Sequence, residues 1–297
     1  MSGAVASVLF VLVWSTGFVV ARAAIAHADP QAFLLARMAA TALLLGLGAA
    51  ALRERRLPAT RAAMHVGLGA AMPGFYLCAS WWSVGTGMPA GVMSLLGALQ
   101  PLPIALIAFL GFGERLSTRS VAGMAVGVAG VTMVLAPTLE RGGATLAVLP
   151  AVFGLAAVLA MAAATLVQHR LLAGDPLLGT VALQNVGGAV TGVLGCLVVG
   201  STRWDGGAWL WASFAWSVLG LSIGGLVLFA WLIGRQGATR VSTLLLLVPA
   251  LAAVEAWALF GETLAPFQIV GFVLALGGVL LARRAADRTP EPAAEPA

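Results

Sequence analysis

The chain has 297 residues, of which 61% are hydrophobic and 9% are charged, and its formal net charge is +5. Soluble globular domains contain roughly 25% charged residues, so this composition excludes a water-soluble globule, and the apolar content also excludes a disordered chain. All 16 basic residues are Arg, and because they lie between apolar runs, they do not indicate a nucleic-acid partner.

Apolar runs alternate with short polar connections along the whole chain. A helix needs about 20 predominantly apolar residues to cross the hydrocarbon layer of a bilayer. Runs of that length are separated here by Gly, Pro, Asp and Arg residues that are typical of turns. Ten membrane-spanning helices are therefore predicted, at residues 3–26, 31–52, 62–83, 88–112, 118–136, 146–168, 176–200, 207–233, 239–260 and 265–283.

Ten crossings place both termini on the same side of the membrane. If that side is the cytoplasm, only four of the 16 Arg residues face outward, which follows the positive-inside rule; they are Arg22, Arg37, Arg141 and Arg203. The first span lacks a basic leader and a clear cleavage site, so it is predicted to be retained and not removed as a signal peptide. We expect a multi-pass protein of the cell inner membrane with cytoplasmic termini and a disordered cytoplasmic tail at 284–297.

An internal repeat divides the chain into halves. The segment 94–130 aligns without a gap to the segment 242–278, and this offset of 148 residues superposes Pro101 on Pro249 and Glu114 on Glu262. Five spans per half is an odd number, so the second half must enter the bilayer upside down. Inverted repeats are typical of secondary transporters, whose substrate site lies near the midplane between the repeats. The predicted fold is an all-α membrane protein of ten transmembrane helices, arranged as two inverted five-helix repeats (1–144 and 145–283) around a central cavity.

Short motifs at fixed positions carry a family resemblance. The first span contains Trp14-Ser15-Thr16-Gly17-Phe18 followed by Arg22, and the second contains Arg37. In each half a Pro precedes a Gly-Glu-x-Leu motif, with Glu thirteen residues after Pro. Over residues 3–283 the chain resembles the EamA-type branch of the drug/metabolite transporter superfamily. The resemblance implies a central cavity and export or exchange of small metabolites, commonly amino acids. Branches that transport sugar phosphates or nucleotide sugars usually place Lys in the cavity. This chain contains no Lys, which counts against those substrates.

Ionisable side chains inside predicted spans are the first candidates for a transport site, because charge is costly in hydrocarbon. Glu255 is expected about 10 Å inside the outer end of the ninth span, where burial favours the neutral acid unless a cation pairs with it. It is either a proton-coupling or ammonium-binding carboxyl, or the partner of a structural Arg. Arg37 and, more weakly, Arg22 either bind a substrate carboxylate or extend to the outer lipid headgroups.

Polar and aromatic residues near the expected midplane form a second group of candidates. Amide side chains need several hydrogen-bond partners, so they either line the cavity or join neighbouring helices, and an indole either forms a wall of the site or packs. This group consists of Trp14, Ser15, Thr16, Gln100, Gln184 and Asn185. Tyr76 and Trp81 are weaker candidates, since Trp81 and Trp82 at the outer end of the third span also fit an aromatic belt at the membrane surface.

The repeated Pro and Glu residues have motif roles. Pro101, with Pro103, interrupts the fourth span and Pro249 the ninth; each either makes a hinge in a broken helix or a kink that only shapes packing. Glu114 and Glu262 lie at span ends on opposite sides of the membrane. We expect each to accept backbone N–H groups at the positive end of the next helix.

Rival classes of protein are not favoured by the sequence. The pattern Gly-x-Ser222-x-Gly resembles a nucleophile elbow, but that chemistry needs a strand-to-helix turn and a His base, so Ser222 is predicted to be a packing residue. The His and Cys residues lack metal-ligand spacing, and no phosphate-binding loop is present. The sequence therefore predicts no enzyme, metal, cofactor or ATPase subunit, but a carrier of a small-molecule substrate in lipid, with protons as a candidate coupling ion. An intramembrane enzyme, a channel and a non-transporting scaffold are the alternatives.

Overall fold

The computed structural model describes residues 2–114, 116–141, 148–172, 174–199 and 202–286. Within these ranges the regular structure is helical, apart from an isolated bridge between Ala28 and Trp204. The helices are α1 (Gly3–Ile25), α2 (Pro30–Ala51), α3 (Ala59–Gly69), η1 (Ala70–Tyr76), α4 (Leu77–Gly85), α5 (Ala90–Ala98), α6 (Pro101–Phe112), α7 (Thr118–Arg141), α8 (Val148–Leu171), α9 (Leu177–Val199), α10 (Ala208–Ala215), η2 (Trp216–Gly224), α11 (Gly225–Gln236), α12 (Ala238–Leu244), α13 (Val248–Phe260) and α14 (Pro266–Ala286).

The all-helical prediction is confirmed, and helices lie where each span was predicted. Among the described residues, eight helical stretches are long and apolar enough to cross a membrane. The other two predicted spans, 239–260 and 265–283, contain the shorter apolar helices Val248–Phe260 and Pro266–Ala282. The predicted tail lies outside the described residues from residue 287 onward.

Two predicted spans are broken at their prolines. A turn at Leu99 and Gln100 separates α5 from α6, and Pro101 is the first residue of α6. In the second half a turn separates α12 from α13, and Pro249 lies in the first turn of α13. Proline is tolerated there because the first N–H groups of a helix have no intrahelical partner. The interruptions follow the sequence prediction, whereas a hinge role stays a prediction.

The third and eighth predicted spans each contain a wide helical segment. The π-helix η1 contains Pro73, and the π-helix η2 contains Ser222. A π-helical segment inserts an extra residue per turn and re-aims the side chains around it, which is why such segments often occur at functional sites. Corresponding spans of the two halves thus share the same irregularity.

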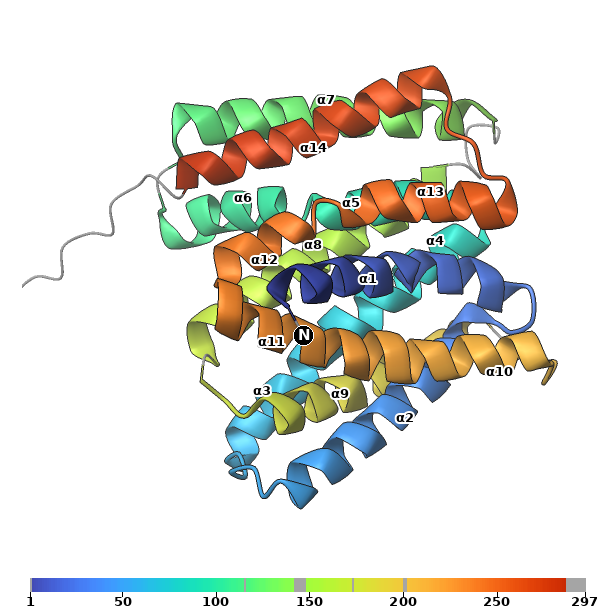
Figure 1. The fold of residues 1–297 in the computed structure, drawn as a ribbon, viewed down its shortest axis with the longest axis vertical. Coiled ribbons are helices and arrows are strands. Elements are labelled where there is room, and N and C mark those ends of the chain that lie inside the picture. The colour runs from blue at the N-terminus through green and yellow to red at the C-terminus, as the bar shows by residue number, and fades with distance from the viewer. Residues whose placement is uncertain (1, 115, 142–147, 173, 200–201, 287–297) are drawn as a thin grey trace, which may run out of the picture.

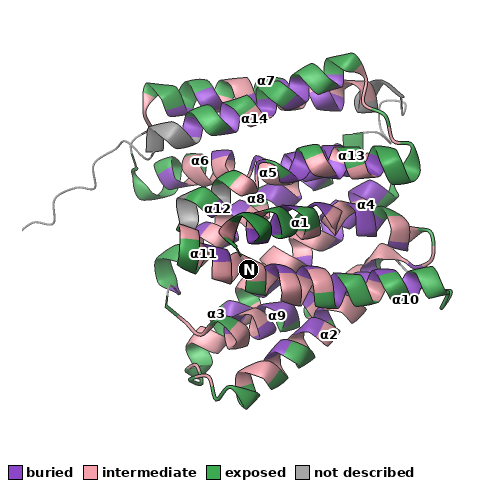
Figure 2. Cartoon of the chain, viewed as in Figure 1, coloured by how far each residue is buried: buried purple, intermediate pink, exposed green. Residues whose placement is uncertain are grey.

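The helices run side by side and form layers (Figure 1). In that view the pair α7–α14 lies at the top, α2, α3 and α9 lie at the bottom, and α1 and α13 lie between them. Many large apolar side chains on the outer helices are exposed (Figure 2), among them Val128 at 64% and Val273 at 65%. Such surfaces suit contact with lipid.

Helix α1 occupies a central position in the packing. Its residue Phe10 belongs to a cluster of buried apolar side chains with α11, α12 and α13, and Val20 belongs to a second cluster with α2, α4 and α10. Phe18 packs against a third cluster that α5, α8 and α14 help to form. Because α1 is held on several sides, the polar residues at its middle have fixed neighbours.

Candidate functional site

The site begins with a carboxyl group between α13 and α1. Glu255 Oε1 lies 2.7 Å from Ser15 Oγ, and Ser15 is 1% exposed. The same hydroxyl lies 3.0 Å from the carbonyl oxygen of Leu12. Glu255 Oε2 is buried and has no hydrogen-bond partner among the described residues. One carboxyl oxygen is therefore held by a helix of the first half, and the other is available to a proton or a ligand.

The neighbours of Ser15 in the sequence point toward a different set of helices. The indole of Trp14 lies 5.1 Å from the ring of Phe10 and 6.0 Å from that of Phe229 on α11, between ring centroids. Thr16 Oγ1 accepts a 2.8 Å hydrogen bond from Trp216 Nε1 on η2. Consecutive helical residues differ by about 100° in direction, which is why Ser15 meets α13 while its neighbours meet α11 and η2.

Arg37 on α2 reaches the same π-helix. Its Nε donates to Ser222 Oγ at 3.2 Å, and Ser222 Oγ in turn donates to the carbonyl oxygen of Ser217 at 3.0 Å. Arg37 is partly buried and has no carboxylate partner within 4.0 Å among the described residues. Ser222, predicted to be a packing residue, is therefore a hydrogen-bond partner of the candidate Arg.

Arg22 is not available to bind a substrate carboxylate in this structure. Its Nε lies 3.3 Å from Glu262 Oε1, so it forms an ion pair, and 45% of its side chain is exposed. Glu262 Oε2 accepts the N–H of Ala90, which begins α5. The prediction that Glu262 accepts backbone N–H groups is correct in kind, but the donor belongs to α5 of the other half and not to the next helix.

Glu114 has a different partner from the one predicted. It forms an ion pair with Arg170 at the end of α8, and the guanidinium carbon of Arg170 lies 4.1 Å from the ring centroid of Phe112. The side chain of Glu114 is 55% exposed. A long Arg side chain reaches this carboxylate more easily than the following helix does, and sequence spacing alone does not reveal that contact.

Two of the three amide candidates join helices. Gln100 Nε2 donates to Thr165 Oγ1 on α8 at 2.9 Å, and Gln184 Nε2 on α9 donates to Gln168 Oε1 on α8 at 3.0 Å. Asn185 donates to the carbonyl oxygen of residue 181 in its own helix. For Gln100 and Gln184 these contacts favour the interpretation that the amides connect helices over the interpretation that they line a cavity, whereas the contact of Asn185 favours neither.

The aromatic residues of the third span differ in how far they are buried. Trp81 is 1% exposed and stacks on Phe33 of α2 at 5.2 Å. The alternative of a surface belt is therefore wrong for Trp81, because the indole faces the helix bundle and fills its core. Trp82 is partly buried, and its ring centroid lies 4.9 Å from that of Phe153. Tyr76 packs against the apolar cluster around α5.

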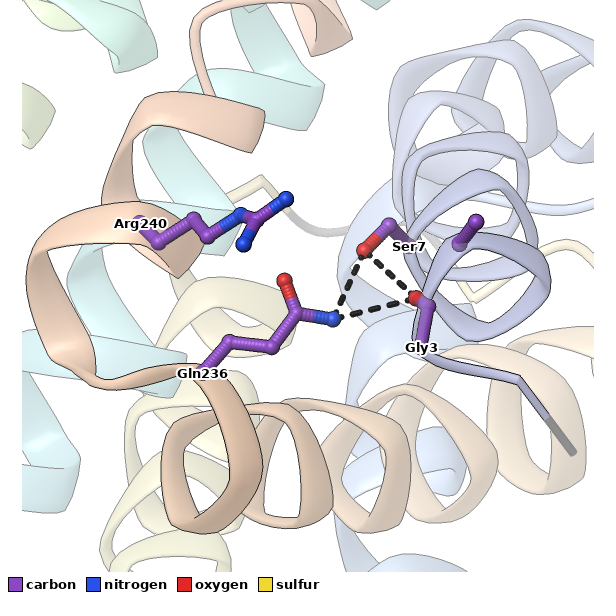
Figure 3. Close-up of a pocket in the computed structure, with 5 residues that line it drawn as sticks. Gly3, Ser7, Gln236 and Arg240 are labelled. Atoms are coloured by element: carbon purple, nitrogen blue, oxygen red, sulfur yellow. Dashed lines mark hydrogen bonds between the residues drawn. The ribbon is translucent and has the colours of Figure 1, made fainter.

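A pocket of about 190 Å³ lies where the start of α1 meets the junction of α11 and α12 (Figure 3). Its lining residues are Gly3, Ala4, Ser7, Gln236 and Arg240. Gln236 Nε2 donates to Gly3 O at 3.0 Å and to Ser7 Oγ at 3.1 Å, which ties α11 to α1. In the described part of the chain no group of His, Cys, Asp and Glu residues is arranged to hold a metal ion.

Sequence reasoning missed three contributors to the site: Trp216, Ser222 and Phe229. Trp216 and Phe229 lie inside an apolar span, where aromatic residues are common and carry no distinct signal. The hydrogen bond from Trp216 to Thr16 connects residues 200 positions apart. The one available signal was the Gly-x-Ser-x-Gly pattern, which marks small residues that allow close approach by another side chain.

Comparison with known proteins gives one family over almost the whole chain. Residues 1–136 and again 148–284 match the EamA-like transporter family. A probable amino-acid metabolite efflux pump of Salmonella typhimurium is 28% identical, covering 93% of this chain and 92% of the relative. A probable terminal-alkyne amino-acid exporter of Streptantibioticus cattleyicolor is also 28% identical, covering 94% and 92%.

A solved crystal structure has the same fold, with a TM-score of 0.66 at 22% identity, covering 97% of this chain and 98% of that one. The long apolar helices establish a multi-pass membrane protein. Two successive matches to one family establish its relationship. The chain therefore belongs to the EamA-like transporter family.

Proposed function

We propose that this protein is a secondary transporter of the inner membrane that exports amino acids or closely related small metabolites. Membership of a transporter family supports transport, and the names of the two relatives support the substrate class. The observation that carries the proposal for this chain is the Glu255–Ser15 pair. It sets a partly unpartnered carboxyl group between helices of the two matched segments.

The proposed architecture is ten crossings in two inverted five-helix repeats, 1–144 and 145–283, with both termini in the cytoplasm. Three observations support it: two successive family matches, broken helices in the fourth and ninth spans, and π-helices in the third and eighth. An odd number of spans per repeat reverses the second copy, and alternating access by rocking of the copies follows from that arrangement.

Glu255 and Arg37 are proposed to bind the two ends of a zwitterion. A substrate ammonium would pair with the Glu255 carboxylate, and a substrate carboxylate would accept N–H groups of Arg37 with the two-pronged geometry that guanidinium favours. When no substrate is bound, a proton on Glu255 removes the cost of a bare charge in hydrocarbon. Substrate ammonium and proton then compete for one carboxyl, which couples export to proton entry.

Counterflow in liposomes tests transport itself. Purified protein in vesicles preloaded with an unlabelled amino acid should accumulate the labelled amino acid transiently and with saturation. Leakage without saturation or counterflow indicates a channel. If no member of a panel of amino acids, amines and amino-acid derivatives gives counterflow, the proposed substrate class is wrong.

Substitutions at the two charges test their roles. Glu255→Gln keeps the shape of the side chain but removes both its charge and its titratable proton, so the half-saturation concentration for an amino acid should rise and the remaining counterflow should lose its dependence on pH. Arg37→Ala removes charge-assisted hydrogen bonds worth about 1.5–3 kcal/mol, so the half-saturation concentration should rise about tenfold or more. Arg235→Ala, which removes an exposed Arg stacked on Trp231 at 5.2 Å, is the control and should leave that concentration unchanged.

A further inference from the structure

The two motif carboxylates and their Arg partners are related by the internal repeat. Arg22 and Arg170 are 148 residues apart, and so are Glu114 and Glu262. This is the offset that aligns the two halves. The ion pairs are exchanged between the halves: Arg22 of the first pairs with Glu262 of the second, and Arg170 of the second pairs with Glu114 of the first.

The two pairs have equivalent local geometry. Arg22 lies in the last turn of α1 and Arg170 in the last turn of α8. Each Glu directly follows a glycine that ends its helix in the left-handed region, Gly113 after α6 at φ 70° and Gly261 after α13 at φ 67°. The N–H of each Glu donates to the carbonyl six residues earlier at 3.3 Å. This glycine cap aims both carboxylates in the same way, so the repeated geometry is a property of the fold.

The pairs lie at opposite ends of the helices. The C-terminal ends of α6 and α13 lie on opposite sides in Figure 1. In the proposed topology Arg22–Glu262 is at the outer surface and Arg170–Glu114 at the cytoplasmic surface. Each pair therefore joins the two halves at one mouth of the pathway whose middle holds Glu255.

Partial exposure makes both contacts reversible. Side-chain exposure is 45% for Arg22, 20% for Glu262, 35% for Arg170 and 55% for Glu114. Ion pairs in contact with water contribute little to stability, because solvent screens them and hydrates the separated charges. A contact of that kind can break and form again in each transport cycle, which a buried ion pair cannot do cheaply.

We propose that Arg22–Glu262 and Arg170–Glu114 are the outer and inner gates of the carrier, and that each must separate for its end to open. This inference rests on the proposed alternating-access function. Both pairs are formed in this structure, as an occluded state requires. Each gate has one additional connection between the halves: Glu262 Oε2 accepts the N–H of Ala90, and the guanidinium carbon of Arg170 lies 4.1 Å from the ring centroid of Phe112.

Cross-linking tests whether the gates must open. In a Cys78→Ala/Cys196→Ala background that still gives counterflow, the pairs Arg22→Cys/Glu262→Cys and Arg170→Cys/Glu114→Cys are joined by a bifunctional maleimide. Either cross-link should stop counterflow, whereas the unlinked double variants should retain it. Full counterflow through a fully cross-linked gate overturns the proposal.

A third cross-link controls for rigidity. In Gly46→Cys/Ala182→Cys the new thiols join α2 to α9, where a Cβ built at Gly46 lies 4.0 Å from that of Ala182, a spacing suited to a disulfide. This contact also joins the halves but is not a gate, so oxidation should leave counterflow intact. If this disulfide stops counterflow as completely as the gate cross-links do, loss of flexibility alone explains the arrest and the gate assignment fails.

Accessibility of the site gives a readout that needs no transported substrate. A Ser15→Cys reporter in the same background is treated with a membrane-impermeant maleimide from either side. Glu262→Gln should raise labelling from outside, and Glu114→Gln should raise labelling from the cytoplasmic side, each by about 1.5-fold to fivefold. The exchanged pair Arg22→Glu/Glu262→Arg should restore the original outside rate. If each substitution changes the labelling rate equally from both sides, or does not change it, the gate assignment is wrong even where counterflow shows a carrier. If each substitution raises labelling only from the expected side but no counterflow is seen, the gate assignment stands and the proposed substrate class is wrong.

Discussion

The two halves of the molecule meet differently at α7–α14 and at α1–α13. Between α7 and α14 the backbones are in contact: a Cβ built at Gly130 would lie 2.4 Å from the backbone nitrogen of Ala275. Between α1 and α13 the contact includes the partly buried hydrogen bond from Ser15 to Glu255. One interface is held by close approach of small residues, and the other contains a carboxyl group that hydrocarbon disfavours.

This difference separates fixed contacts from contacts that can open. Glycine on both helices lets α7 and α14 approach along their length, and such packing is lost entirely if the helices move apart by an ångström or two. The α1–α13 interface continues outward to the exposed Arg22–Glu262 pair, whose separation water compensates. We therefore interpret α7–α14 as scaffold and α1–α13 as a seam of the transport pathway.

The largest decrease in melting temperature is expected when a large side chain is introduced into the α7–α14 contact. Gly130→Leu must push α14 away, because the nearest neighbours of its Cβ are backbone atoms of Ala275 and Gly271 that cannot yield. Overpacking of this kind should cost about 3 kcal/mol or more, seen as a lower melting temperature of the purified protein. Gly277→Leu on α14 is the matched control, since a Cβ there has no neighbour within 4 Å. Equal melting temperatures for the two variants would contradict a fixed α7–α14 contact.

A second fixed contact is an ion cluster between the halves, in which the acidic side chain and the imidazole are buried and the two Arg side chains are partly exposed. Asp175, 3% exposed, accepts hydrogen bonds of 3.0 Å from Arg61 Nε and from His65 Nε2, and Arg55 lies 3.7 Å away. Asp175→Asn removes the charge that balances these groups, and breaking a buried pair leaves the remaining charge uncompensated. We expect a melting temperature lower by about 5 °C or more. Asp205→Asn, at a 43% exposed carboxylate paired with His27, should cause a much smaller decrease.

The same cluster predicts a dependence of stability on pH. The hydrogen bond from His65 is the largest influence on the carboxyl and, with Arg61, holds the pKa of Asp175 below its ordinary value of 3.8 against the opposing effect of burial. A carboxyl whose pKa is lowered by folding contributes stability above its ordinary pKa and loses it as the pH falls through the lowered value. The difference in melting temperature between wild type and Asp175→Asn should therefore shrink below about pH 4. A constant difference down to pH 3 would show that the charge of Asp175 is not responsible.

The fold was largely predictable because the bilayer imposes one strong rule. Helix lengths follow from its thickness, so the expected starts of the spans agree with the observed helices to within three residues, as at 31 for Pro30–Ala51 and 176 for Leu177–Val199. Proline chemistry likewise predicted the breaks near Pro101 and Pro249. The π-helices carry no comparable signal, since their extra residue depends on packing around η1 and η2.

The candidate site was predictable in its charges and not in its pairings. Hydrocarbon makes any ionisable residue conspicuous, so Glu255 and Arg37 stand out in the sequence. Their partners Ser15 and Ser222 lie 240 and 185 residues away, and which hydroxyl faces which charge depends on helix rotation. Trp81 shows the same limit: its position near a span end suits the membrane surface, but the direction of its ring, set by helix rotation, places it in the core.

The smallest decrease in melting temperature is expected for substitutions at the gates, and this distinguishes the gates from the scaffold. Glu114→Gln removes an ion pair whose carboxylate is 55% exposed, so the cost in stability should stay below about 1 kcal/mol. In a membrane protein of this size the melting temperature should then fall by less than about 4 °C, less than for Asp175→Asn under the same conditions. Both substitutions neutralise one acidic residue that joins the halves near the C-terminal end of α8, so they differ in burial and in the number of partners. A decrease for Glu114→Gln as large as that for Asp175→Asn would place the Glu114–Arg170 pair among the fixed contacts, and this pair could not serve as a gate.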